Sequence, residues 1–298
     1  MNVAAVDLGT NTTRLLVADV ADDRVEELHR ETRITRLGEG VDARRRLLPL
    51  PIARVRNALT DYRRTAESLG AERTLLVATS AVRDAENGEA FLGEIEWSYG
   101  FATQLLSGDE EAELTKRGVG DLGRETLLVD LGGGSTELIV DGFHTSLPMG
   151  SVRFTERHGE DAAASIEAAR PLLPDLEPRD AVGVAATITS IAALDLGLTE
   201  YDRERVDGHV LTRDGARAQL ERLTGLTLDE RRRVPGLEPE RAPVIVAGAA
   251  IVVAILDAYG LDAIRISERD LLDGAALAAA ELPEPEEGDA PPGAYTCC

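Results

Sequence analysis

The stretch VDLGTNTTRLLV at residues 6–17 matches the stretch VDLGGGSTELIV at residues 129–140 without a gap. The Asp, the first Gly, a Thr and all the apolar positions occur in both copies. Each copy consists of an apolar run, a turn rich in Gly and hydroxyl side chains, and a second apolar run, which is typical of a β-hairpin. Because the chain contains the motif twice, we predict two similar lobes.

Mixed helical and strand patterns follow each hairpin, so we predict an α/β fold. The lobes are expected at 1–121 and 122–280, and the acidic, Pro-rich tail at 281–298 is expected to be disordered. After the first hairpin, the apolar spacing predicts helices at 51–69, 89–99, 110–119, 160–172, 187–195, 213–223, 240–259 and 270–280. It predicts strands at 74–78, 126–131, 135–140, 143–148 and 263–267.

The composition limits the classes of function. The chain has 298 residues, of which 43% are hydrophobic, enough for one or two cores. A net charge of -22 and an aromatic content of 3% argue against a DNA partner, which requires a basic surface. We also predict no signal peptide and no membrane span, because an acid interrupts the first apolar run and later runs are short. Since the only cysteines are Cys297 and Cys298, we expect no disulfide or zinc site and a cytoplasmic location.

The two turns have the composition of a phosphate-binding cradle. Gly permits close approach of the backbone, and N–H and hydroxyl groups supply donors. A single Gly-rich turn is more often an ordinary turn, but here each of two copies follows an Asp at the end of a buried strand. We therefore predict that the turns face each other across a cleft, where Asp7 and Asp130 converge on a metal ion.

The two hairpins differ at one charged position. Position 14 is Arg, whereas its counterpart at position 137 is Glu. Arg14 could pair with a phosphate oxygen, and Glu137 could bind a divalent ion or orient water. The alternative is that both side chains lie on solvated strand faces.

Two further segments carry candidate residues. The acids of SGDEEAE, residues 107–113, suit a helix start, and this accounts for Asp109 and Glu110. Glu111 could instead turn into the cleft and accept a proton from an attacking water. In TSAVRD, residues 79–84, hydroxyls and Arg83 follow a buried strand and could contact an anion, although a helix cap with a surface Arg is the alternative.

Five segments in this order resemble the exopolyphosphatase and guanosine pentaphosphate phosphohydrolase (Ppx/GppA) family of the actin-like ATPase (ASKHA) superfamily: DLGTNTTRLL, ATSAVRDAENG, SGDEEAE, LLVDLGGGSTEL and ISERDLLDGAAL. The resemblance runs from Val3 to about Ala278. It implies two actin-like, ribonuclease H-like lobes with a cleft between them.

The resemblance also implies roles for individual residues. The family's general base corresponds to Glu111, with Glu110 as the fallback if the alignment shifts by one. Asp130 and Glu137 match the acids that hold Mg²⁺ (or Mn²⁺) and the water, which makes Glu137 a second catalytic residue. The family's phosphate-contacting positions correspond to Gly9, Thr10, Asn11, Thr12, Arg83, Gly132, Gly133, Gly134 and Ser135.

The implied reaction is hydrolysis of a terminal phosphoanhydride in inorganic polyphosphate, in guanosine pentaphosphate (pppGpp, giving ppGpp), or in both. In long family members additional helical domains lengthen the polyphosphate path. We expect this chain to end where the second lobe closes, so short polyphosphate chains or a nucleotide are expected to be preferred. In GVAAT, residues 183–187, Ala186 stands where the family's nucleotide-pocket turn has glycine, which argues against a tightly bound nucleoside.

Family members often dimerise, so a homodimer is compatible with the resemblance. Two alternative functions stay open at this point. One is a kinase of the same superfamily, which would transfer phosphate from ATP to a sugar or a carboxylate. The other is a non-catalytic sensor that binds polyphosphate or an alarmone and signals to a partner.

Overall fold

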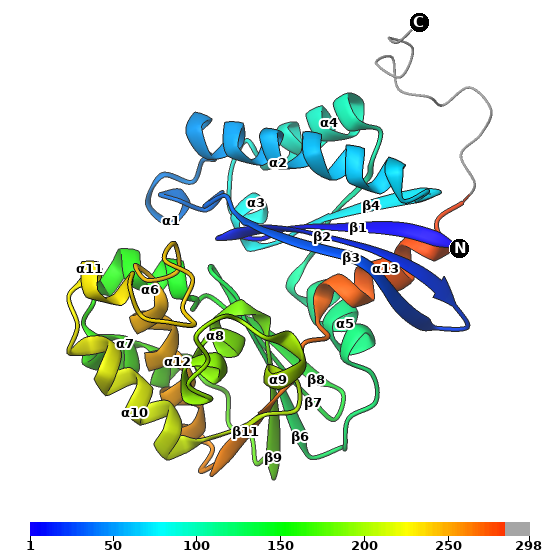
Figure 1. The fold of residues 1–298 in the computed structure, drawn as a ribbon. Helices are drawn as coiled ribbons and strands as arrows, with labels where there is room; N and C mark the ends of the chain where they lie inside the picture. The colour runs from blue at the N-terminus through cyan, green and yellow to red at the C-terminus, as the bar shows by residue number, and fades with distance from the viewer. Residues whose placement is uncertain (284–298) are drawn as a thin grey trace, which may run out of the picture. The chain divides into compact units, whose positions relative to one another are not determined.

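A computed structural model describes residues 1–283, and Figure 1 shows the course of the chain. These residues form two compact units. The first comprises Met1–Gly118 and the segment that begins at Leu271, and the second comprises Val119–Asp270. The tail predicted at 281–298 lies outside the described residues from 284 onward, as do both cysteines.

The first unit contains a five-stranded sheet made of β1 (Asn2–Leu8), β2 (Thr12–Ala21), β3 (Arg24–Ile34), β4 (Arg73–Ala78) and β5 (Ala102–Leu105). The strand order is β3-β2-β1-β4-β5, in which the first three strands form an antiparallel meander and β4 and β5 run parallel to β1. The carboxyl ends of the parallel strands meet at one edge of the sheet, which is where ligands bind in open α/β sheets. The first Gly-rich turn joins β1 to β2 at this edge.

Helices cover both faces of this sheet. One face packs against α2 (Pro49–Ser68) and α4 (Gly88–Tyr99), and the other packs against α13 (Leu271–Glu281). Successive side chains of a strand point to opposite faces. Val6 therefore lies in the cluster with α2 and α4, whereas its neighbour Ala5 lies in the cluster with α13.

The last helix belongs to the first unit, although the sequence analysis placed residues up to 280 in the second lobe. Its apolar stripe completes the core beneath β1 and β4. The packing against α5 (Gly108–Val119) is close, because a Cβ on Gly274 would lie 1.9 Å from the carbonyl oxygen of Leu114. Local apolar periodicity predicts such a helix but not the sheet on which it packs.

The second unit repeats the strand order of the first. Its sheet has the order β10-β11-β9-β6-β7-β8, so β8-β7-β6-β9-β11 corresponds to β3-β2-β1-β4-β5, with β10 added at one edge. The prediction of two ribonuclease H-like lobes in an α/β fold is confirmed. The strands are β6 (Thr126–Leu131), β7 (Thr136–Val140), β8 (Phe143–Leu147), β9 (Asp180–Val184), β10 (Val210–Thr212) and β11 (Ala263–Ile266).

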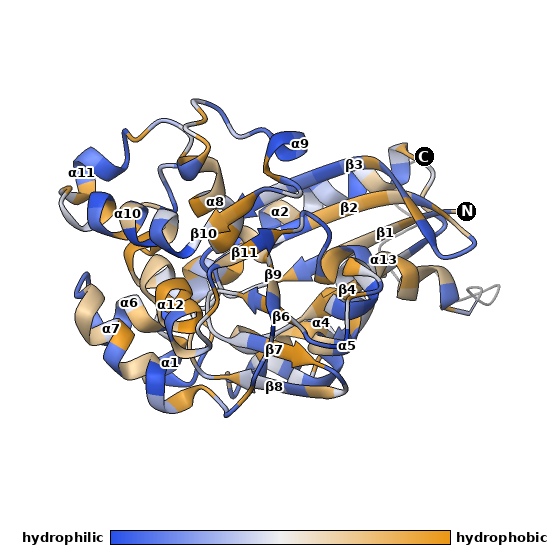
Figure 2. Ribbon diagram, turned by 90° about the horizontal axis from the view of Figure 1, so that it is seen from below, coloured by the Kyte–Doolittle hydropathy of each residue, from blue (hydrophilic) through white to orange (hydrophobic). Residues whose placement is uncertain are grey.

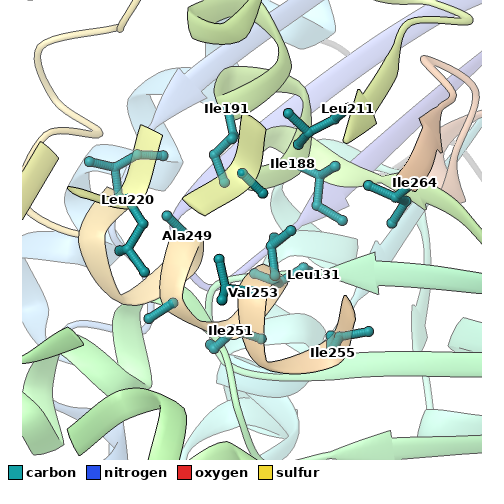
Figure 3. Packing of buried hydrophobic residues seen from close by; sticks show 14 of the residues in the cluster. Leu131, Ile188, Ile191, Leu211, Leu220, Ala249, Ile251, Val253, Ile255 and Ile264 are labelled. Atoms are coloured by element: carbon teal, nitrogen blue, oxygen red, sulfur yellow. The ribbon is translucent and has the colours of Figure 1, made fainter. Parts of the chain in front are cut away.

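The core of the second unit is built around α12 (Ile245–Ala258), whose residues from Ile245 to Leu256 are all buried. Figure 2 colours most of this helix as hydrophobic, and Figure 3 shows its side chains Val253 and Ile255 among those of the surrounding elements. No helix in residues 1–283 is long and apolar enough to cross a membrane. The helices around α12 are α6 (Ser151–His158), α7 (Ala162–Ala169), α8 (Ala185–Asp195) and α10 (Arg213–Thr224).

Several elements were not predicted from the sequence. The strand β3 was missed because its side chains are charged and mostly exposed or half-buried, so it has no clear apolar alternation. The other missed strands, β5, β9 and β10, are short. The helix α6 was also missed, as were the short helical segments α1 (Val41–Arg44), α3 (Ser80–Arg83), α9 (Arg203–Val206) and α11 (Leu228–Arg231), whereas η1 (Arg170–Leu172) lies within the helix predicted at 160–172.

The junction of β9 and α8 contains a strained residue. Ala185 has φ 69°, in the left-handed region that favours glycine. The sequence analysis singled out Ala186 as the departure from glycine, but the residue with positive φ is Ala185. Such a conformation costs an alanine about 1–2 kcal/mol.

We predict that Ala185→Gly stabilises the protein by about 0.5–1 kcal/mol, since the relief of strain exceeds the added entropy of the unfolded chain. The neighbouring Ala186→Gly should destabilise it by up to about 1 kcal/mol, because that residue has no positive φ to relieve. Urea denaturation gives the free energy of unfolding of each variant. A lower free energy of unfolding for Ala185→Gly than for the wild type would contradict the proposed strain at Ala185.

Candidate active site

Backbone hydrogen bonds close the turn of the first hairpin and connect it to a second segment of the chain. Gly9 N–H donates to the carbonyl oxygen of Thr12 at 2.9 Å. The carbonyl oxygens of Thr10 and Asn11 accept hydrogen bonds of 2.8–3.1 Å from backbone N–H groups in segment 35–38, which follows β3. The tip of the turn therefore has its carbonyl groups fixed from one side.

The turn of the second hairpin is held in the same way. Gly132 N–H donates to the carbonyl oxygen of Ser135 at 3.0 Å. The carbonyl oxygens of Gly132 and Gly133 accept hydrogen bonds of 2.8–3.1 Å from backbone N–H groups in segment 151–153, at the start of α6. A side chain of the same segment donates to the Gly134 carbonyl oxygen at 2.6 Å. The repeat therefore extends to the segment after the third strand, which sequence comparison of the hairpins did not show.

This arrangement determines where the amide groups of the turns point. In a trans peptide the N–H and the C=O point in opposite directions. With the carbonyl groups held on one side, the N–H groups that follow them are directed to the other side. Among residues 1–283, no hydrogen bond uses as donors the N–H groups of Asn11, Gly133 or Gly134, each of which follows a held carbonyl group. Such concave sets of N–H groups bind anions.

The Asp at the end of the first strand pairs with the Arg of the second strand. Asp7 and Arg14 are opposite each other in the β1–β2 register. Arg14 Nε and Nη2 both lie near Asp7 Oδ2, at 2.9 and 2.8 Å. The guanidinium therefore compensates the charge of the carboxylate that the sequence analysis assigned to a metal, and Arg14 itself is engaged beside the turn rather than on a solvated strand face.

The corresponding pair in the second hairpin consists of two carboxylates. Asp130 and Glu137 are opposite each other in the β6–β7 register, and both are buried. Ser146 Oγ donates to Glu137 Oε1 at 2.7 Å. Two neighbouring carboxylates repel each other unless a proton or a cation compensates their charge.

The donor set of the second hairpin fits a magnesium ion that also binds substrate. Mg²⁺ is usually held by one or two carboxylates together with substrate phosphates and water. Within residues 1–283, no group of three or more His, Cys, Asp or Glu residues that could hold a metal is found. Asp130 and Glu137 thus match the two-carboxylate kind of site rather than a cage made by the protein alone.

Glu111 lies in the first turn of α5 and is only 6% exposed. Arg83 Nη1 donates to Glu111 Oε2 at 3.0 Å and to the carbonyl oxygen of Leu106 at 2.7 Å. Among residues 1–283, the hydrogen bonds and the ion pair of Arg83 use this nitrogen alone. Arg83 therefore orients the Glu111 carboxylate and retains Nε and Nη2 as donors.

Glu110, the fallback for the base, has a different role. Ser107 N–H and Oγ both donate to Glu110 Oε2 at 2.8 Å, and Glu110 N–H donates to Ser107 Oγ at 3.2 Å. These contacts form a capping box at the start of α5. The backbone N–H and hydroxyl of Ser107 lower the pKa of this exposed carboxyl. Glu110 therefore stabilises the start of α5, where the sequence analysis placed it.

The fold and these turns define a class of two-lobe α/β protein with a Gly-rich turn in each lobe. Residues 16–281 match the model of the Ppx/GppA phosphatase family. The chain therefore belongs to the Ppx/GppA phosphatase family, and it is a phosphohydrolase.

Two curated relatives illustrate the range of this family. "Exopolyphosphatase 2" of Mycobacterium tuberculosis is 40% identical, and the alignment covers 93% of this chain and 98% of that protein. "Guanosine-5'-triphosphate,3'-diphosphate pyrophosphatase" of Vibrio vulnificus is 32% identical over 92% of this chain and 58% of its own length.

Solved structures agree with this assignment. An exopolyphosphatase-like protein has a TM-score of 0.85 at 32% identity, covering 93% of this chain and 98% of that one. The Ppx/GppA enzyme of Aquifex aeolicus has a TM-score of 0.77 at 29% identity, covering 93% and 99%.

Gly150 offers a test of the second turn. A Cβ at this position would lie 2.5 Å from the backbone carbon and oxygen of Gly133, so the turn must move to accommodate it. We predict that Gly150→Ala lowers phosphate release at least tenfold. Gly93→Ala in α4 is the control, because no atom lies within 4 Å of its added Cβ, and it should retain full activity. Equal rates for the two variants would contradict a role of the turn.

Proposed function

We propose that this chain hydrolyses the terminal phosphoanhydride of inorganic polyphosphate and of guanosine pentaphosphate. The names of the two curated relatives support these substrates. The observation that carries the proposal is the buried Glu111 carboxylate, held by Arg83 at the sheet edge that also bears a Gly-rich turn. Membership in a phosphatase family favours hydrolysis over the kinase and sensor alternatives.

In this proposal Glu111 accepts a proton from the attacking water. Phosphoryl transfer requires mainly positioning and electrostatic stabilisation, because the transition state is loose. The N–H groups of the Gly-rich turns bind phosphate oxygens, and the remaining donors of Arg83 supply further hydrogen bonds to phosphate. The oriented carboxylate then directs the water toward phosphorus, in line with the leaving oxygen.

Asp130 and Glu137 would hold Mg²⁺, or Mn²⁺, together with substrate phosphates. The ion supplies charge neutralisation for a polyanionic substrate near a protein with a net charge of -22. Arg14 compensates Asp7 in the first hairpin, so we assign the metal to the second hairpin and give Asp7 the role of holding Arg14 beside the turn.

The proposal includes three finer points. Short polyphosphate chains are the preferred polymers, which activity on a length series will test. The protein acts in the cytoplasm, consistent with a sequence whose only cysteines are a terminal pair. It forms a homodimer, as the family resemblance implies, which its mass in solution will test.

Replacing each of the two adjacent glutamates in turn should show which of them acts as the base. We predict that Glu111→Gln lowers kcat by roughly 10²–10⁴-fold, the contribution of a general base. Glu110→Gln should retain kcat within about threefold and lose only part of the helix cap. Phosphate release from short-chain polyphosphate and guanosine pentaphosphate, with Mg²⁺ present, measures both variants.

Several results would contradict this assignment. Full activity of Glu111→Gln would exclude it as the base, and a loss in Glu110→Gln alone would move the role to the neighbour. Phosphate transfer from ATP to an added acceptor, without release from polyphosphate, would favour the kinase.

Removal of divalent metal should abolish turnover. We predict that excess chelator lowers the rate at least 100-fold and that Mg²⁺ restores it. Glu137→Gln should need a tenfold higher Mg²⁺ concentration for half-maximal rate, because one of two carboxylates is lost, whereas Glu113→Gln on the exposed side of α5 should not. An unchanged rate in chelator would rule out the metal.

A further inference from the structure

Arg153 of α6 holds the second Gly-rich turn by its side chain. Its Nε donates to the carbonyl oxygen of Gly134 at 2.6 Å. The backbone N–H groups of Arg153 and Val152 donate to the preceding carbonyl oxygen, that of Gly133, at 3.1 and 2.8 Å. One residue thus contacts two successive peptide groups of the turn.

The side-chain contact fixes the last of three successive glycine carbonyl groups. The first two are held by the backbone of α6, but the Gly134 carbonyl has Arg153 Nε as its partner. Because the peptide is planar and trans, this bond directs the N–H of Ser135 away from α6. It also gives a charged donor to the carbonyl, and such hydrogen bonds are stronger than neutral ones.

Among residues 1–283, no side chain donates a hydrogen bond to the Thr10 or Asn11 carbonyl oxygen of the first turn. There the carbonyl oxygens of Thr10 and Asn11 receive only backbone N–H groups from segment 35–38. The difference is consistent with the composition of the turns. Two adjacent glycines at the tip of the second turn leave its backbone with more conformational freedom to restrain than Thr-Asn does.

We propose that Arg153 is a positioning residue for the proposed phosphohydrolase reaction, on which this inference rests. It acts through the Gly134–Ser135 peptide, which it holds with the N–H toward the bound terminal phosphoryl group. Phosphate charge becomes redistributed in the transition state, so preorganised donors contribute to kcat more than to ground-state binding. Arg153 therefore affects kcat more strongly than KM.

The test compares Arg153→Ala with Arg157→Ala, which removes an exposed arginine one turn later on the same helix. We expect Arg153→Ala to lower kcat roughly 10- to 100-fold, the effect of losing one charge-assisted hydrogen bond, with KM changed less than about threefold. Added methylguanidinium should restore part of the rate in this variant only. Arg157→Ala should match the wild type in kcat and KM.

Arg153→Lys keeps the charge but not the Nε donor near the backbone, so it should recover less than half of the lost rate. Rates are taken at a temperature where circular dichroism shows each variant folded. A wild-type kcat in folded Arg153→Ala, or an equal loss in Arg157→Ala, would overturn the inference. An inactive wild-type protein would instead reject the proposed function.

Discussion

Both Gly-rich turns depend on hydrogen bonds that their carbonyl oxygens accept from a neighbouring backbone segment. A short backbone loop has many accessible conformations, and an anion-binding turn must have its N–H groups on one side before the ligand arrives. Segments 35–38 and 151–153 meet this requirement by occupying the carbonyl oxygens. Close approach is possible because Gly150 has no Cβ, which would otherwise lie 2.5 Å from the backbone of Gly133. At Gly38 a Cβ would lie 2.2 Å from the side-chain methyl of Thr10.

The two units share topology but carry different chemical groups at equivalent positions. The hairpin of the first unit contains an Asp–Arg ion pair, and that of the second contains two carboxylates. In the proposed mechanism the first unit therefore supplies the base, and the carboxylates of the second unit would hold the ion that neutralises charge.

Much of this could be read from the sequence, because the deciding signals are local. The duplicated hairpin and the helices with clear apolar spacing need only neighbouring residues to be recognised. The helix-capping role of Glu110 also follows from local spacing, since Ser107 lies three residues before it. Distinguishing Glu111 from Glu110 as an inward-facing side chain required the tertiary structure.

The features that the sequence did not predict are long-range contacts. The packing of α13 on the first sheet joins segments at opposite ends of the chain. The pairing of Arg14 with Asp7 depends on the hairpin register; the hairpin was predicted, but neither this register nor the ion pair was inferred. The support of the turn by Arg153 depends on the path of the chain after β8, and PMGSVR at residues 148–153 carries no periodic signal for it.

The most direct test of the account measures binding and chemistry separately in Glu111→Gln. Calorimetric titration with short-chain polyphosphate and Mg²⁺ gives the affinity, and single-turnover phosphate release gives the rate. If Glu111 acts on the water and is not needed to bind the substrate, the variant will bind within about threefold of the wild type and release almost no phosphate. Loss of binding together with turnover, or turnover at the wild-type rate, would contradict this division of roles.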